Sequence, residues 1–477
     1  MRFFIQDHCD HSSFHPNNGN GLVDRSDVGK DKPLHVRHSG ANMVANALRS
    51  GCATLFASAT VLIPIGAVEA NAGAFGIREQ STVGLGDTFA GVAAGGALSS
   101  MFWNPATMTQ TPGFGIEGNG TGIFPNVDQH PSAGSTLLPL GFGGASDTGS
   151  PALLFSGYST WQINPNLWVG SSINSPFGLT TSFPDLWAGR NYALGSSLRT
   201  YNATPSVGLR INEWLSVGLG VQLQYGRADE NFGLTPVPPT HLNLKGSGWG
   251  FGLTAGVTVT PGPNTTIGVG WRSAVDQKID GSLNLSLSEA ANTTLYLPDI
   301  VSAGIRHRFD DRWTVMGTAE WTNWSRIGTS IVNQAAPALL GPVALPFQYR
   351  DGWFYSVGAE YELDAKTTLR GGVAYEMSPI TDQVRMPIVP DNNRFWLSAG
   401  ASYKMLSNFI VDFGYSHIWV KDANINISRT SGNPWFNPVL PISYVGNASA
   451  GVNIFSVSLR YMFNAPPPPV APLTTKG

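Results

Sequence analysis

The chain has 477 residues, a net charge of −3 and 12% charged residues, whereas an average globular protein has about 25%. So little charge argues against an ordinary soluble protein, which needs charge to stay dispersed, and no basic excess indicates nucleic-acid binding. A mean hydropathy of −0.03 excludes a helical membrane protein, and 56 glycines with 14 tryptophans favour a β-rich chain with one face in lipid.

The first element in chain order is an apolar segment at residues 52–68, preceded by an arginine and followed by Ala70-Asn71-Ala72. This order of charge, short apolar core and A-x-A pattern is typical of a secretory signal peptide, and the core is too short to span a bilayer. We predict that residues 43–72 are the signal peptide and that the mature chain begins after cleavage at Ala72.

Residues 1–42 are polar and have no periodic pattern. We interpret them as a non-structural upstream extension, with a genuine leader extension as the alternative. Both cysteines, Cys9 and Cys52, precede the predicted cleavage site. The mature chain is therefore expected to have neither a disulfide framework nor a thiol catalyst.

Residues 73–112 are rich in glycine and other small residues. Gly84 and Gly86 belong to a stretch that can fold compactly. Asn104-Pro105-Ala106 has the pattern of a helix start, in which Asn caps and Pro takes the first helical position. On the residues alone, a plain turn or cap explains this motif.

From about residue 113, apolar residues alternate with small or polar ones, as in residues 215–224 and 252–259. Because successive side chains of a strand point to opposite faces, each strand has one aliphatic face. That face suits the core of a soluble sandwich or propeller, or the lipid side of an outer-membrane barrel. Segments of about ten residues or more, short turns alternating with long loops and aromatic residues at strand ends favour the barrel.

We predict an all-β fold, a 14-stranded antiparallel transmembrane β-barrel over residues 113–463, with a Pro-rich tail at 464–477. An even strand number allows closure with both termini on the periplasmic side. The tail is either an inert spacer or a segment that reaches a periplasmic partner. The predicted strands are residues 113–123, 152–163, 167–180, 196–211, 214–227, 249–260, 265–275, 299–309, 313–324, 353–363, 367–377, 394–406, 409–420 and 450–463.

The third predicted strand contains a defect at Asn174, Pro176 and Gly178. Proline removes a donor from the ladder and glycine packs nothing, yet open backbone groups must be satisfied within a membrane. Either the strand ends at Asn174 and a loop begins, or the strand bends inward and leaves a gap. We favour the kink.

Two long loops, at residues 335–347 and 434–442, are nearly all apolar. Exposed apolar patches usually mark interaction surfaces. The loops form either an outer surface that captures hydrophobic molecules or a lid that packs on itself. Their large apolar residues are Leu339, Leu340, Phe347, Trp435 and Phe436.

Little in the sequence indicates catalysis. His417 lies on a predicted strand near Asp412 and Ser416, but it points to the opposite face, and no nucleophile elbow is visible. The segment at residues 113–118 matches a dinucleotide fingerprint by letters only, because no helix follows it. We predict a protein that is not an enzyme and that needs neither a metal nor a cofactor.

Taken together, residues 73–463 resemble the FadL/TodX family of outer-membrane transporters for long-chain fatty acids and other hydrophobic compounds. The order and spacing of several short segments make the match specific, although any one alone would be weak. These segments are Gly84-Leu85-Gly86, Asn104-Pro105-Ala106, Asn174–Leu179, Gly248–Gly252 with Trp271-Arg272-Ser273, Asn323-Trp324-Ser325 and Leu369–Gly372.

The resemblance implies that residues 73–112 form a small N-terminal hatch that plugs the barrel. Substrate is expected to be captured by the outer loops, to bind a lumenal pocket at Phe75, and to leave sideways at the Gly178 kink when the hatch moves. Long-chain fatty acids are the first expected substrates. The alternatives are uptake of neutral or aromatic hydrocarbons by the same route, and a general diffusion porin.

The resemblance also implies a multi-pass location in the outer membrane of a Gram-negative bacterium. The expected partners are a hydrophobic small molecule, outer-membrane lipid, and the barrel-assembly machinery during insertion, with no nucleic acid.

One expected feature is missing. Fatty-acid members of the family are expected to carry a basic residue soon after the fifth strand, where Phe232 stands here, and Arg227 is the nearest cation. A carboxylate in an apolar pocket needs a paired charge. Either Arg227 or a distant basic residue binds the carboxylate, or the ligand is neutral.

Overall fold

The computed structural model of the chain describes residues 73–233, 241–284, 288–334, 343–428 and 442–463. The predicted upstream extension, signal peptide and Pro-rich tail lie outside these ranges. Within them, no helix has both the length and the apolar character that crossing a bilayer would require.

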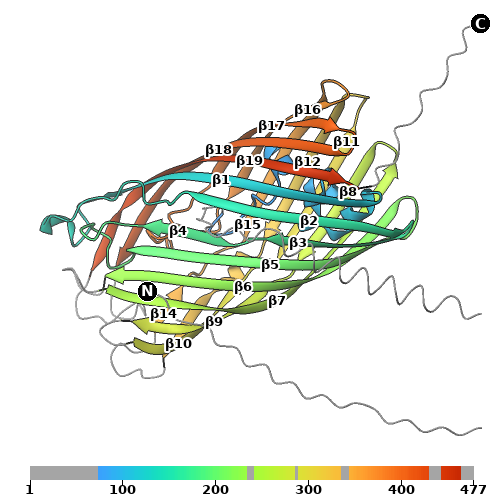
Figure 1. The fold of residues 1–477 in the computed structure, drawn as a ribbon. Helices are drawn as coiled ribbons and strands as arrows, with labels where there is room; N and C mark the ends of the chain where they lie inside the picture. Colours follow the sequence, from blue (N-terminus) through green and yellow to red (C-terminus); the bar gives the residue numbers. More distant parts are fainter. Residues whose placement is uncertain (1–72, 234–240, 285–287, 335–342, 429–441, 464–477) are drawn as a thin grey trace, which may run out of the picture. The chain divides into compact units, whose positions relative to one another are not determined.

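The strands form one antiparallel sheet that closes into a barrel, because the first strand, β1 (Phe114–Pro131), pairs along its length with the last, β19 (Ser443–Met462) (Figure 1). Five strands are interrupted, so nineteen β-segments make up fourteen strands, and the predicted 14-stranded barrel is confirmed. The other segments are β2 (Ala152–Asn164), β3 (Leu167–Asn174), β4 (Gly178–Ser182), β5 (Gly195–Arg210), β6 (Leu215–Gly233), β7 (His241–Gly262), β8 (Thr265–Arg272), β9 (Val275–Asn284), β10 (Ser288–Leu297), β11 (Ile300–Arg308), β12 (Trp313–Thr322), β13 (Thr329–Gln334), β14 (Val343–Pro346), β15 (Gly352–Glu362), β16 (Thr367–Met377), β17 (Arg394–Leu406) and β18 (Phe409–Ser428).

Several observed strands are longer than predicted at the end that carries the long loops. The first was predicted to end at residue 123, but β1 continues to Pro131. Beyond residue 124 the outward side chains become polar, as at Asn126 and His130, while the backbone ladder with β19 continues. The hydrophobic alternation therefore reports the part of each strand that faces lipid, and the barrel wall extends past it.

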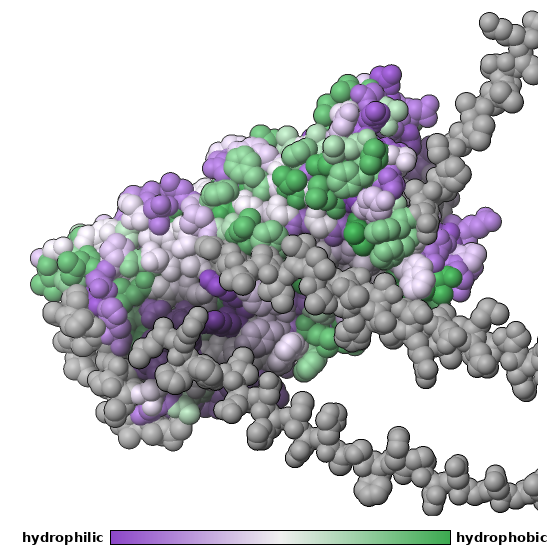
Figure 2. Space-filling model, viewed as in Figure 1, coloured by the Kyte–Doolittle hydropathy of each residue, from purple (hydrophilic) through white to green (hydrophobic). Residues whose placement is uncertain are grey.

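Opposite faces of β6 show why the aliphatic side of the strands faces outward. Leu219 and Val221 are exposed on the outer surface, whereas Gln222 and Gln224 are buried in the lumen. A soluble sandwich would bury the aliphatic face instead. Figure 2 shows hydrophobic side chains gathered over the outer wall.

The outward face of β6 also shows where the membrane ends on the outer side of the barrel. We call the lipid-facing apolar part of the wall the lipid band, and its outer edge lies on this strand. It is apolar through Leu223 and aromatic at Tyr225, whose ring contacts that of Trp249 on β7. The next outward residues are charged, Arg227 and Asp229. Aromatic residues favour the membrane–water interface, so residues of β6 beyond Tyr225 lie outside the membrane.

Residues 73–112, where the hatch was predicted, lie inside the barrel and are almost entirely buried. Asn104 caps one of their short helices as predicted: its side chain accepts from Ala106 N at 3.0 Å. The same side chain donates to Ala93 O and, in the wall, to Val257 O. The helical segments are α2 (Thr82–Gly86), η1 (Val92–Ala94), η2 (Leu98–Phe102) and η3 (Pro105–Gln110), with η4 (Leu138–Leu140) and η5 (Trp324–Ile327) in the loops.

Glycines of the wall let this internal segment approach the strands closely. A Cβ atom at Gly268 or Gly270 on β8 would lie 1.8 Å from Ala93 O or Trp103 O, respectively. These positions therefore exclude every other residue unless the backbone moves. In the hatch itself, a Cβ at Gly86 would lie 3.0 Å from the Cα of Gly400 on β17.

Buried ion pairs also connect the internal segment to the wall. Arg78 contacts Glu320 on β12 at 2.6 Å and Glu376 on β16 at 3.2 Å. A charge taken out of water is costly unless it is paired. Removing one partner would therefore leave an uncompensated charge and weaken the attachment of the hatch.

Candidate functional site

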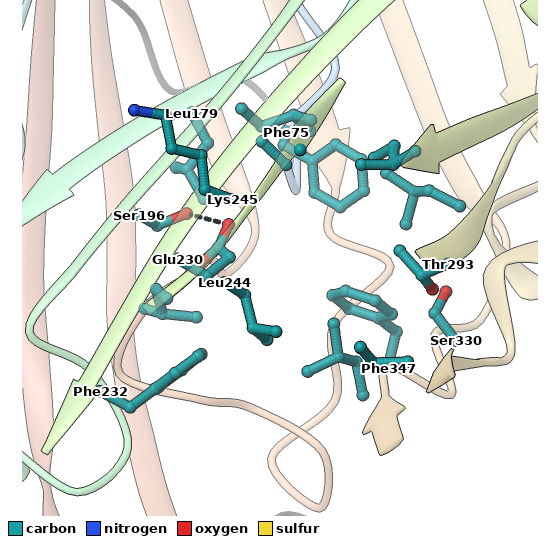
Figure 3. Close-up of a pocket in the computed structure, with 18 of the residues that line it drawn as sticks. Phe75, Leu179, Ser196, Glu230, Phe232, Leu244, Lys245, Thr293, Ser330 and Phe347 are labelled. Atoms are coloured by element: carbon teal, nitrogen blue, oxygen red, sulfur yellow. Dashed lines mark hydrogen bonds between the residues drawn. The ribbon is translucent and has the colours of Figure 1, made fainter. Parts of the chain in front are cut away.

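An apolar cavity of about 120 Å³ lies inside the barrel wall, next to the first described residues of the chain (Figure 3). Phe75 contributes the hatch side, and strands from both halves of the barrel contribute the rest. Among the lining residues are Leu179 on β4, Leu198 on β5, Phe232 on β6, Leu244 on β7, Ile279 on β9, Leu295 on β10, Val332 on β13, Leu345 on β14, and Phe347, Tyr349, Val384, Met386 and Ile388 between strands.

The structure brings two of the three predicted ligand-binding residues together. Phe75 and Phe232, distant in sequence, both line this cavity and are buried. Arg227 does not line it: its side chain is exposed on the outward face of β6. The prediction of Arg227 as a ligand-binding residue therefore needs correction, because an odd-numbered position on this strand points away from the lumen.

Phe75 forms the floor of the cavity, and an aromatic cluster lies behind it. We use this name for Phe75, Phe177 and Trp324, whose rings make edge contacts with centroids 4.8 Å apart for Phe75–Trp324, 6.4 Å for Phe75–Phe177 and 6.0 Å for Phe177–Trp324. Such contacts contribute about 0.5–1.5 kcal/mol each beyond area burial. Phe347, from an apolar loop, adds a fourth ring near Phe75 at 6.2 Å.

A second, smaller cavity of about 50 Å³ borders the aromatic cluster. Phe177 and Trp324 line it, together with Arg78 and its two carboxylate partners. Pro176 of the predicted kink also lines it. The aromatic cluster thus lies between a large apolar cavity and a smaller one that is bordered by charged side chains beside strand three.

Strand three is kinked, not ended, at the predicted defect. β3 stops at Asn174 and β4 resumes at Gly178, and both segments pair with β5. Residues 176–179 are all buried, so the usual alternation is lost and the strand bends inward. The opened ladder is completed by the hatch: Ile77 N donates to Pro176 O at 2.8 Å, and Gly178 N donates to Phe75 O at 2.9 Å.

The kink leaves part of the wall without a ladder. β2 pairs with β3 only from Gly157 onward, and β4 makes no ladder with the preceding part of β2. Gln80 of the hatch spans this interval. Its carbonyl accepts from Ser156 and Tyr158 of β2 at 2.8 and 2.7 Å, and its side-chain amide donates to Ser175 O at 2.8 Å.

The sequence did not single out three residues of this site, Gln80, Trp324 and Glu230. Trp324 belongs to a segment that carried the family resemblance, and Glu230 lies in the run that followed the fifth predicted strand. Nothing local distinguishes Gln80, because its partners are far away in sequence.

The structure also places some of the predicted hatch and capture residues. Gly84, Gly86 and the Asn104-Pro105-Ala106 motif lie in the buried internal segment described above. Of the predicted capture residues, Phe347 lines the cavity. Leu339, Leu340, Trp435 and Phe436 lie outside the described residues.

The candidate catalytic groups do not meet. The Asp412 carboxylate is held by Ser458 at 2.7 Å and by Arg460 at 2.7 and 2.8 Å. The His417 ring instead contacts Asn453 Oδ1 at 2.9 Å. An Arg-paired carboxylate and a distant imidazole do not form a nucleophile–base pair.

Comparison with known proteins identifies the family. The model of the family described as outer membrane protein transport protein (OMPP1/FadL/TodX) matches residues 63–463. The chain belongs to this family. It is therefore a transport protein of the Gram-negative outer membrane, in a family that carries hydrophobic compounds, and not an enzyme.

Two curated proteins of the FadL/TodX family are similar to this chain over most of their length. Outer membrane protein P1 of Haemophilus influenzae is 28% identical over 464 residues, covering 86% of this chain and 99% of its own length. The long-chain fatty acid transport protein of Escherichia coli K12 is 26% identical over 430 residues, covering 78% and 94%.

Solved structures share the fold of this FadL/TodX family member. A Pseudomonas aeruginosa FadL homologue superposes with a TM-score of 0.74 at 23% identity, covering 82% of this chain and all of its own. The toluene transporter TodX of Pseudomonas putida gives 0.60 at 15% identity, covering 84% and 100%.

Proposed function

We propose that this protein takes up long-chain hydrophobic molecules, with fatty acids as the first class to test, by passive movement through the barrel wall. The single observation that carries the proposal is the apolar cavity with Phe75 at its floor. The name of the Escherichia coli relative, a long-chain fatty acid transport protein, supports fatty acids as the first class. Burial of alkyl chain supplies about 0.8 kcal/mol per CH₂, so binding needs no energy source.

Capture begins at the outer loops. Phe347 connects one apolar loop to the cavity, and Leu339, Leu340, Trp435 and Phe436 provide the outer capture surface in this proposal. In this proposal an alkyl chain then passes along Phe347 into the cavity. The lining around Phe232 and Leu244 holds it there.

Release requires movement of the hatch beside the kink. Displacing residues 75–80 breaks the two backbone hydrogen bonds to Pro176 and Gly178 and removes Gln80 from the wall. The aromatic cluster then separates, and the interval between β2 and β4 opens toward lipid. The ligand leaves sideways into the membrane, so it never enters water.

Neutral or aromatic hydrocarbons are the second candidate class. In the described part of the cavity lining, the only cationic side chain is that of Lys245, and Figure 3 shows its ammonium group turned away from the other lining residues. A general diffusion porin is disfavoured because residues 73–112 fill the lumen. Insertion by the barrel-assembly machinery, with outer-membrane lipid around the wall, completes the proposal.

The test is uptake by a Gram-negative host that lacks its own carrier and expresses residues 43–477. Radiolabelled oleate and toluene are supplied in parallel, with an empty vector as the control. Oleate uptake supports the fatty-acid class, and toluene uptake alone supports neutral hydrocarbons. Uptake of neither, from a folded protein in the outer membrane, contradicts the proposal.

A further inference from the structure

The wall of the large cavity contains one acidic side chain, Glu230, among the described lining residues. It lies on β6 between Ala228 and Phe232, which line the same cavity. The Ser196 hydroxyl of β5 donates to Glu230 Oε1 at 2.7 Å (Figure 3). The remaining exposure of Glu230 is toward the cavity, because the even-numbered residues of β6 point inward.

Nearby charges do not neutralise this carboxyl group. The charged residues on the neighbouring strands that lie closest in the ladder are Arg199 on β5, Arg227 and Asp229 on β6, and Lys245 on β7. All four are odd-numbered and belong to the outward face, whereas Glu230 points inward. Lys245 also borders the cavity, but its ammonium group is turned away from the other lining residues (Figure 3). Lys245 Nζ lies 4.0 Å from Asp229 Oδ2 on that outer face.

The protonation state of Glu230 follows from this placement. The residue lies beyond the outer edge of the lipid band, and burial raises its pKa to about 8, with the negative charge of Asp229 acting in the same direction. Below about pH 8 the carboxyl is protonated and neutral, and it can donate a hydrogen bond. Above that pH it is ionised and can only accept.

A second polar group faces the cavity from the opposite side. Figure 3 shows Ser330 and Thr293 across from Glu230 and Ser196. The Thr293 hydroxyl donates to Ile331 O at 2.9 Å, whereas the buried Ser330 hydroxyl has no hydrogen-bond partner within the described residues. A buried hydroxyl without a partner is costly, and a ligand with a polar group would satisfy it.

We propose that Glu230 makes the cavity selective for long-chain molecules with a neutral hydrogen-bonding head group, such as an alcohol, an amide or a protonated fatty acid, over an ionised carboxylate. This inference rests on the proposed function. The cavity offers a neutral donor at Glu230 and a neutral hydroxyl at Ser330. An ionised carboxylate would instead enter an apolar space without a facing cation, beside an acidic group.

The test measures displacement of a fluorescent alkyl probe from the purified full-length protein by dodecanol and by dodecanoate. At pH 7 we expect dodecanol to bind at least about tenfold more tightly, because an unpaired buried charge costs more than a lost neutral hydrogen bond. A third ligand, methyl dodecanoate, can only accept a hydrogen bond and does not titrate, and its affinity should fall by about fivefold or more as the pH rises through 8, because ionised Glu230 no longer donates.

Glu230→Gln isolates the role of this carboxyl, because the amide has a similar size and does not titrate. This variant should bind methyl dodecanoate with an affinity that does not change between pH 6.5 and 9.5. Asp280→Asn is the matched control, since it removes one negative charge from the exposed face of the same wall. The control should keep the pH step of the wild type.

Three results would overturn the inference. Dodecanoate binding as tightly as dodecanol to the wild type at pH 7 contradicts the selectivity, while the proposed function stands. An unchanged pH step in Glu230→Gln contradicts the assignment to this residue. Failure of all three ligands to displace the probe removes the proposed function as well, so the two failures are distinguishable.

Discussion

Substitution of Gly178 tests the exit route at the kink. A Cβ atom at this position would lie 2.7 Å from Ile77 Cδ1 and 3.4 Å from Leu198 O. Gly178→Ala must therefore displace only the end of one flexible side chain, at a cost of about 1 kcal/mol. We expect the barrel to fold and uptake to change by less than about fivefold, because this small strain on the closed hatch does not block the exit.

Gly178→Arg is the stronger perturbation. Its side chain starts against Ile77 and must occupy the wall interval beside a cavity of only about 50 Å³. Moving ligand past a charged group in this space costs several kcal/mol. We expect uptake to fall by about a hundredfold or more, equivalent to about 2.7 kcal/mol, while binding in the large cavity changes by less than about threefold.

The assay combines oleate uptake by the carrier-deficient host with probe binding to purified protein. Heat-dependent gel mobility establishes that each variant is folded. Gly157→Ala on β2 and Gly262→Arg at the end of β7 are the matched controls, because a Cβ at either glycine would meet no atom within 4 Å. Normal uptake by folded Gly178→Arg refutes the lateral route, and equal losses of binding and uptake place the defect in the cavity instead.

Three further predictions concern the hatch and its processing. Phe75→Ala removes a ring that lines the cavity, and the apolar contact that this ring offers an alkyl chain is worth about 1.5 kcal/mol, so we expect about tenfold weaker probe binding; unchanged affinity would exclude Phe75 from the site. Gly270→Ala places a Cβ 1.8 Å from Trp103 O, and we expect the hatch of this variant to be cut faster by protease than that of Gly157→Ala, with equal rates contradicting the close contact. N-terminal sequencing of the outer-membrane protein should begin at Gly73 whether translation starts at Met1 or Met43; any other start contradicts the predicted cleavage.

The barrel was predictable because lipid and lumen impose opposite demands on alternate residues of every strand. The kink was predictable for a related reason, since Pro176 and Gly178 conflict with a continuous ladder. The same alternation also predicts the direction of the Arg227 side chain. It shares the odd-numbered face of β6 with Leu219 and Val221, so it had to point outward, and Glu230 had to point inward.

The closure of the wall was not predictable from local pattern. Gln80 meets Ser156 and Tyr158 only because the barrel brings segments distant in sequence together. The extension of β1 to Pro131 was missed because the ladder continues where hydrophobic alternation has ended. Both features depend on hydrogen bonds accepted by backbone carbonyl groups, which leave little trace in residue type.

The Gln80 bridge has a consequence for the permeability barrier of the cell. The first residues of the hatch bridge the interval between β2 and β4, whereas η1 packs against β8 and β11 in another part of the wall. Local displacement of this edge would open a path toward lipid while the rest of the plug still blocks the aqueous route. Hydrophobic molecules would then cross the outer membrane without opening an aqueous channel for ions or hydrophilic antibiotics.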